Sequence, residues 1–143
     1  MRKVTIILML ALVFAGCKPN TKKTETEGTQ AVAAVSRTDT AAVKVNYFHG
    51  KQRCKTCIAV GNVAKATVEK AYADNNRVVY YEINTNEDSA KGWIEQYDVT
   101  WNALIIDKGG NSVEITKQAF ATALENPQAL EDLIIKEVNK RLQ

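Results

Sequence analysis

The chain has 143 residues, of which 45% are hydrophobic and 24% are charged, and its formal net charge at neutral pH is +3. That length supports about one domain with a single modest core. The small excess of positive charge, to which Arg2 and Lys3 contribute, excludes the strongly basic surface that is typical of nucleic-acid-binding proteins.

The first 16 residues have the features of a secretory signal peptide. Arg2 and Lys3 precede an apolar run from Val4 to Phe14 that contains one threonine. Because this run is too short to span a bilayer comfortably, we expect residues 1–16 to be cleaved. The rest of the chain is then expected to lie outside the cytoplasm.

The sequence FAGC, from Phe14 to Cys17, resembles the lipobox of bacterial lipoproteins, although Phe14 replaces the usual leucine. The resemblance implies that Cys17 is lipidated and becomes the mature N-terminus. Lipidation uses one of the three cysteines and leaves Cys54 and Cys57 as an isolated pair. The expected location is therefore the cell envelope, such as the periplasm, with the lipid held in a membrane.

Residues 17–42 are rich in Thr, Lys, Glu and Ala and contain no aromatic residue. Such a segment buries too little apolar area to offset the entropy lost on ordering, so we predict a flexible tether. A flexible chain of about 25 residues has a root-mean-square reach of about 25 to 30 Å. That reach is enough to hold a domain away from a membrane surface.

A regular pattern begins at residue 43. The sequence VKVNYFH, residues 43–49, alternates in the manner of a strand, with its apolar residues predicted inward and Lys44 and Asn46 outward. A helix is predicted to begin at or just after the two cysteines and to end at the turn-forming DNN of residues 74–76.

Four further elements follow. Residues 77–84 (RVVYYEIN) are β-branched and aromatic and predict a central strand. Residues 86–98 have an apolar helical face and acidic residues in the first turn. Residues 102–107 and 111–115 surround a KGG turn and predict a hairpin. Asn-Pro starts a final helix over residues 126–142, which carries an apolar stripe.

This order of elements is that of the thioredoxin fold, a mixed four-stranded sheet with helices on both faces. The CxxC pair lies between the first strand and the first helix, as it does in thioredoxin-like proteins, which the chain resembles. We therefore expect residues 43–143 to form a thioredoxin-like α/β domain.

Within that group, YFHGKQRCKTC over residues 47–57 is similar to the bacterial ArsF family, also described as the nitrophenyl compound nitroreductase subunit family. The chain has no flavin, nicotinamide or Gly-rich nucleotide motif. No cofactor is therefore expected, and any nitroreduction would require a partner subunit.

The cysteine pair is the candidate catalytic site. A thiolate is the nucleophile in thiol chemistry, and the N-terminus of a helix stabilises it. Lys51, Arg53 and Lys55 add positive charge to the same turn. We expect Cys54 to attack, Cys57 to resolve, and the pair to exchange disulfides or electrons with a partner protein, as a couple more oxidising than a typical thioredoxin.

Three alternatives remain open. The pair can be a static disulfide, although a loop with two intervening residues constrains the unfolded chain little. It can bind a thiophilic metal ion or arsenite, with His49 as a third ligand beside Cys54 and Cys57. The domain can also be a non-catalytic accessory subunit of a reductase, in which the fold serves only as a docking surface.

The sequence departs from thioredoxins at two places. Residues 97–106 (YDVTWNALII) lack the proline that faces the cysteines in that family. Trp101 and Asn102 are expected to flank the site there with an aromatic face and an amide, although Trp101 can instead cap the core. In the first strand, Asn46 is predicted to take the place of the buried acid that thioredoxins carry.

Overall fold

The computed structural model describes residues 42–143. The predicted signal peptide of residues 1–16, the predicted lipid site at Cys17 and almost all of the predicted tether of residues 17–42 lie outside the described residues. Among residues 42–143, no helix is both long enough and apolar enough to cross a membrane.

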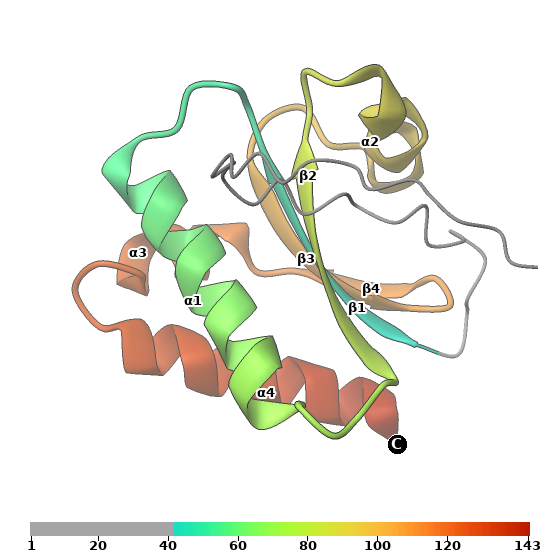
Figure 1. Ribbon diagram of the computed structural model, residues 1–143, viewed down its shortest axis with the longest axis vertical. Helices are drawn as coiled ribbons and strands as arrows, with labels where there is room; N and C mark the ends of the chain where they lie inside the picture. The colour runs from blue at the N-terminus through green and yellow to red at the C-terminus, as the bar shows by residue number, and fades with distance from the viewer. Residues whose placement is uncertain (1–41) are drawn as a thin grey trace, which may run out of the picture. The chain divides into compact units, whose positions relative to one another are not determined.

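The described chain forms a mixed sheet with helices on both faces (Figure 1). In chain order the elements are β1 (Val43–His49), α1 (Lys55–Ala71), β2 (Val78–Asn84), the 3-10 helix η1 (Asp88–Ala90), α2 (Lys91–Tyr97), β3 (Ala103–Lys108), β4 (Asn111–Glu114), α3 (Thr116–Thr122) and α4 (Pro127–Leu142). The strands are arranged β2-β1-β3-β4. β1 is parallel to β2, whereas β3 is antiparallel to both β1 and β4.

The sheet separates two apolar clusters. The larger one lies between the sheet and helices α1, α3 and α4, and its fully buried residues include Val45, Leu104 and Ile134. The smaller one lies under α2 and is centred on Phe48 and Ile105. This division into two clusters places helices on both faces of the sheet, as predicted.

The strand order corrects two predictions. β1 is an inner strand that is buried along its whole length, so Lys44 and Asn46, predicted to point outward, are 4% and 0% exposed. The strand predicted over residues 77–84 was expected to be central, whereas β2 (Val78–Asn84) lies at the edge of the sheet. Alternation along β1 reflects its two cores rather than a core and solvent, because α2 covers the second face.

Helix α3 was not predicted. It has only seven residues and no side-chain hydrogen bond at its N-cap, so the usual signal of a helix start is missing. Its position is fixed by Thr116, whose Oγ1 accepts a hydrogen bond of 2.9 Å from the backbone N–H of Leu104, and by Ala119, which is fully buried.

The predicted hairpin and final helix are confirmed. Gly109 and Gly110 have φ angles of 59° and 92°, which glycine adopts without the steric penalty of a side chain. Asn126 caps α4, since its Oδ1 accepts a hydrogen bond from the N–H of Ala129, and Pro127 is the first helical residue.

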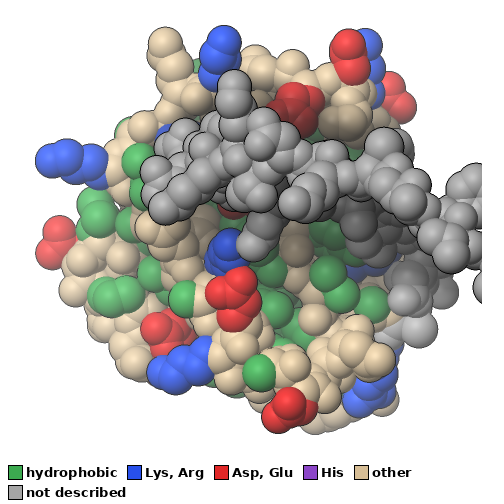
Figure 2. All heavy atoms as spheres, viewed as in Figure 1, with side chains coloured by type: hydrophobic (Ala, Val, Ile, Leu, Met, Phe, Trp, Pro, Cys, Tyr) green, Lys and Arg blue, Asp and Glu red, His purple; other side chains and the backbone are tan. Residues whose placement is uncertain are grey.

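Basic and acidic residues are equal in number in the described domain. Residues 42–143 contain 13 basic and 13 acidic residues. Figure 2 shows both signs interspersed on the visible face, without a patch of one sign. On this face, charged groups of opposite sign lie near one another rather than in separate regions.

Candidate active site around Cys54 and Cys57

Cys54 is the N-cap of α1, at the point where the chain leaves β1 and enters the helix. Its backbone is extended, with φ −75° and ψ 169°, and its Sγ accepts a hydrogen bond of 3.3 Å from the N–H of Cys57. The two Sγ atoms lie 2.6 Å apart. Both cysteines carry free thiols, and the start of the helix therefore holds them within reach of each other.

The two thiols have different environments. Cys54 is exposed, whereas Cys57 is 6% exposed. Hydrogen bonds from the Cys57 thiol and from the backbone N–H of Cys57 lower the pKa of Cys54. Burial, followed by the hydrogen bond with Cys54, raises the pKa of Cys57. At neutral pH Cys54 is therefore the more nucleophilic of the two sulfurs.

Tyr47 lies beneath Cys57 on the α1 face of the sheet. Its hydroxyl donates a hydrogen bond of 2.6 Å to the carbonyl oxygen of Cys57. Burial raises the pKa of Tyr47 to about 12, so the hydroxyl stays protonated at neutral pH. The placement predicted for Asn46 is therefore wrong, because alternation along β1 turns that side chain to the α2 face, near Tyr97.

An ion pair lies beside Tyr47. Arg53 Nη1 is 2.6 Å from Glu82 Oε1, and the guanidinium carbon is 5.5 Å from the centroid of the Tyr47 ring. The side chain of Arg53 is 24% exposed. Arg53 is therefore directed towards a carboxylate on β2, and hydrogen bonds at the helix start are the leading cause of the lowered Cys54 pKa.

Gly61 in the interior of α1 leaves room for this arrangement. A Cβ at position 61 would lie 2.6 Å from Arg53 Nη2 and 2.9 Å from Cε1 of the Tyr47 ring. A glycine inside a helix destabilises it by about 0.5 to 1 kcal/mol relative to alanine. The close approach of α1 to Tyr47 and Arg53 explains why this residue is nevertheless a glycine.

The His49 ring faces a backbone carbonyl oxygen and a carboxylate oxygen. Its Nδ1 lies 2.9 Å from the carbonyl oxygen of Gly50, and since a carbonyl only accepts, Nδ1 carries the proton. Its Nε2 lies 3.4 Å from Glu82 Oε1. Within residues 42–143, no three His, Cys, Asp or Glu side chains are placed to hold a metal ion. In this arrangement both ring nitrogens of His49 face oxygen atoms.

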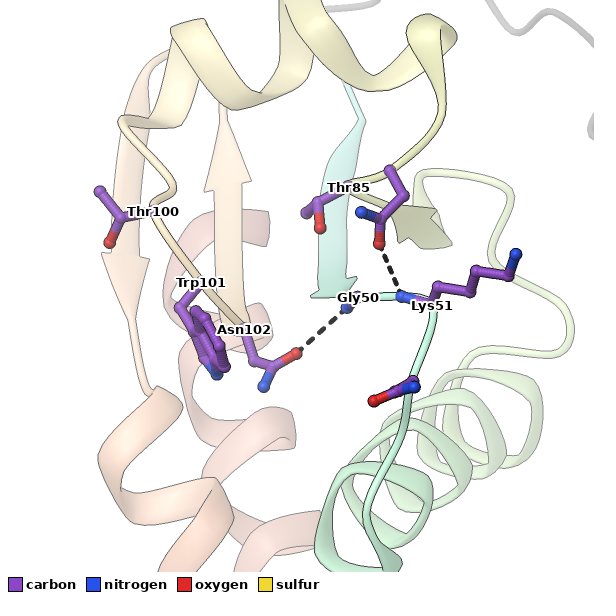
Figure 3. A pocket seen from close by; sticks show the side chains of 8 residues that line it. Gly50, Lys51, Thr85, Thr100, Trp101 and Asn102 are labelled. Carbon is purple, nitrogen blue, oxygen red and sulfur yellow. Dashed lines mark hydrogen bonds between the residues drawn. The ribbon is translucent and has the colours of Figure 1, made fainter.

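The loop before β3 brings Asn102 close to Cys57. Asn102 accepts a hydrogen bond of 3.4 Å from the N–H of Gly50 through Oδ1, and its Nδ2 lies 3.9 Å from Cys57 Sγ. Trp101 is 79% exposed and so does not cap the core. Figure 3 shows Trp101 and Asn102 on one side of a cavity of about 570 Å³, with Gly50 and Thr85 across from them.

Glu82 is the site residue that sequence reasoning missed. It stands in a strand of alternating residues, where an acidic side chain usually faces solvent. Its pairing with Arg53, 29 positions earlier, places it beside the site. A basic residue next to a CxxC motif is a signal that an acidic partner can exist, but it does not locate that partner.

No family model matches the chain, and no curated protein sequence matches it. Solved structures do match. The chain is similar to the zinc-bound form of human ERp44, with a TM-score of 0.52 and 16% identity over 70% of this chain and 27% of that chain. It is also similar to Trxlp from Edwardsiella tarda EIB202, with a TM-score of 0.43 and 17% identity over 67% and 84% of the respective chains.

The likeness to ERp44 shows the fold alone, and this chain spans about a quarter of that protein's length. The predicted thioredoxin-like fold is confirmed, with a mixed four-stranded sheet and helices on both faces. Together with the CxxC pair at the start of α1, it supports thiol–disulfide exchange.

Proposed function

We propose that this protein exchanges thiols and disulfides with a partner protein through Cys54 and Cys57. The observation that carries the proposal is the asymmetry of the pair. An exposed N-cap thiol with a lowered pKa stands next to a buried thiol with a raised pKa, and their sulfurs are 2.6 Å apart. A static disulfide needs no difference in exposure or pKa between its two cysteines, whereas a nucleophilic cysteine with a resolving partner does.

The reaction proceeds in two steps. The Cys54 thiolate attacks one sulfur of a partner disulfide, which forms a mixed disulfide and releases the other partner sulfur as a thiolate. The Cys57 thiol then loses its proton to solvent and attacks Cys54 Sγ, which breaks the mixed disulfide. Two electrons pass to the partner, its two sulfurs leave as thiols, and Cys54 and Cys57 become a disulfide.

We further propose that this exchange takes place in the cell envelope. Cleavage after residue 16, a lipid on Cys17 and a tether over residues 17–42 would hold the domain near a membrane. The similarity of residues 47–57 to the ArsF family agrees with a role beside a partner subunit. Metabolic labelling with a radioactive fatty acid tests the anchor, since Cys17→Ser is expected to abolish incorporation.

The trapping experiment uses the full chain. Cys57→Ser is expected to accumulate a mixed disulfide with a partner from envelope extracts, because Cys54 attacks and nothing resolves the adduct. Cys54→Ser is the matched control and is expected to trap at least about tenfold less, since the remaining thiol is buried. Absence of an adduct with Cys57→Ser, together with ordinary alkylation of Cys54 at neutral pH, would remove the proposal.

A binding function is the second candidate, because two thiols this close can both ligate one thiophilic ion. Titration of the reduced protein with arsenite and with Cu(I) separates the two functions. Tight binding of either ion without any trapped partner would favour the binding module, whereas a trapped partner with weak binding supports exchange. His49→Ala is expected to leave the affinity unchanged, because both ring nitrogens face other oxygens.

A further inference from the structure

Asn102 stands in the loop where thioredoxin-like proteins carry a proline, and its amide has a defined orientation. The backbone N–H of Gly50 can only donate, so the atom of Asn102 that faces it must be the oxygen Oδ1. The amide nitrogen Nδ2 therefore points to the other side, where it lies 3.9 Å from Cys57 Sγ. One side chain thus joins the loop before β3 to the start of the active-site turn and to the buried sulfur.

We propose that Asn102 takes part in the exchange reaction by donating its Nδ2–H to Cys57 Sγ and stabilising the thiolate that resolves the mixed disulfide. This inference rests on the proposed function. It assigns a catalytic role to a side chain where a proline would have no hydrogen to donate.

The need for such a donor appears at the second step of the reaction. Within residues 42–143, the polar side-chain groups that contact Cys57 Sγ are the Cys54 thiol and the Asn102 amide. Once Cys54 is bonded to the partner, it has no hydrogen to donate. The negative charge that develops on Cys57 Sγ when its proton leaves to solvent is then met by Asn102.

Two other polar side chains of the site make hydrogen bonds elsewhere. The Tyr47 hydroxyl donates to the Cys57 carbonyl oxygen, and Arg53 Nη1 is held by Glu82. Burial raises the pKa of the Cys57 thiol, and backbone hydrogen bonds at the start of α1 oppose that rise only in part, so a further donor would increase the fraction of resolving thiolate at neutral pH. A charge-assisted hydrogen bond from a neutral amide opposes that rise and adds no charge of its own.

The informative substitution is Asn102→Asp. A carboxylate keeps an oxygen for the N–H of Gly50 but replaces the donor beside the sulfur by an acceptor. Asn86→Asp is the matched control, because Asn86 Oδ1 accepts a hydrogen bond of 2.7 Å from the N–H of Lys51 on the same turn. Both variants add one negative charge near the site, and only the first removes a donor from Cys57.

Two measurements are made on the full chain. With Cys54→Ser added, the ultraviolet absorbance of the Cys57 thiolate is followed against pH. With both cysteines present, the release of a cysteine-containing peptide from its mixed disulfide with Cys54 is timed at neutral pH. We expect Asn102→Asp to titrate about one pH unit higher and to release the peptide about tenfold more slowly, since one pKa unit changes the thiolate fraction tenfold. Asn86→Asp is expected to stay within about twofold of the unsubstituted chain, because an exposed charge is screened.

Equal release rates and equal Cys57 titration in the two variants would overturn the inference. Slow release without any change in the Cys57 titration would also overturn it, because it would indicate a purely structural role. Should Asn102→Asp fail to fold by circular dichroism, Asn102→Leu provides the same test without the added charge. Failure of the proposed function would give a different result from failure of this inference. The unsubstituted chain would then form no mixed disulfide at all.

Discussion

Buried polar groups on the two faces of β1 differ in whether they find hydrogen-bond partners. On the α1 face, the Tyr47 hydroxyl donates to Cys57 and the Arg53 guanidinium pairs with Glu82, although Arg53 Nε has no partner among the described residues. On the α2 face, neither amide atom of Asn46 finds a partner within residues 42–143, and the Tyr97 hydroxyl finds none there either. Asp107 and Asn46 neighbour that hydroxyl without reaching hydrogen-bond geometry.

The difference indicates where the fold depends on polar contacts. A buried group that is satisfied contributes about 0.5 to 1.5 kcal/mol, whereas one that is left unsatisfied costs about 1 to 3 kcal/mol. Polar groups on the α1 face therefore stabilise the platform beneath the cysteines. Those on the α2 face weaken the domain, and substitutions on the two faces are expected to change stability in opposite directions.

The largest expected effect is that of Gly61→Ala, which breaks the packing on the α1 face. The added Cβ is too close to the Tyr47 ring, and overpacking of this kind costs about 1 to 3 kcal/mol, of which the better helix propensity of alanine returns up to about 1. We expect the free energy of unfolding to fall by about 1 to 2 kcal/mol, as measured by urea denaturation.

Gly50→Ala is the control for that prediction. A Cβ at position 50 would meet Asn86 Oδ1 at 3.6 Å, an ordinary contact. The free energy of unfolding of the Gly50→Ala variant is expected to stay within about 0.5 kcal/mol of that of the unsubstituted chain. If the two glycine variants were equally stable, close packing of α1 on Tyr47 would not be a determinant of this fold.

A matched pair of tyrosine substitutions compares the faces directly. Tyr47→Phe removes a buried hydrogen bond and is expected to lower the free energy of unfolding by about 1 kcal/mol. Tyr97→Phe removes a hydroxyl that has no partner among the described residues, so stability is expected to be unchanged or slightly raised. Equal losses in the two variants would contradict the contrast between the faces.

The same two tyrosines are expected to make the stability of the domain fall at alkaline pH. Burial raises the pKa of Tyr47 and of Tyr97 from 10.0 to about 12, so ionisation of either hydroxyl favours the unfolded chain above about pH 10, and the stability of the domain falls as pH rises towards 12. Each phenylalanine variant is therefore expected to lose stability less steeply over that range. Urea denaturation at a series of alkaline pH values measures the slope.

The smallest expected effect is a gain in stability. Asn46→Val replaces a fully buried amide by an apolar side chain of similar size that suits a strand. We expect the free energy of unfolding to rise by up to about 1 kcal/mol. A loss of stability would contradict the view that the buried amide lowers the stability of the domain.

The sequence predicts the elements that carry local signals and fails where only distant contacts decide. Asn126 and Pro127 mark the start of α4, and the residues around Cys54 mark the start of α1. The inner position of β1 and the role of Glu82 have no local signal, because each depends on elements that are distant in the chain. Asn102 was expected near the site, but its contact with Cys57 joins residues 45 positions apart, and no periodicity reveals that contact.

The exposure of Trp101 gives the protein its own optical reporter. The indole is 79% exposed and lines the same cavity as Asn102, so a partner that covers it would shift its fluorescence emission to shorter wavelength. The other tryptophan, Trp93, has its ring centroid 5.2 Å from that of Tyr81 and 6.2 Å from that of Tyr97, and it reports on the integrity of the fold. In a Trp93→Phe variant, partner docking at the active site can therefore be followed in real time without any attached dye.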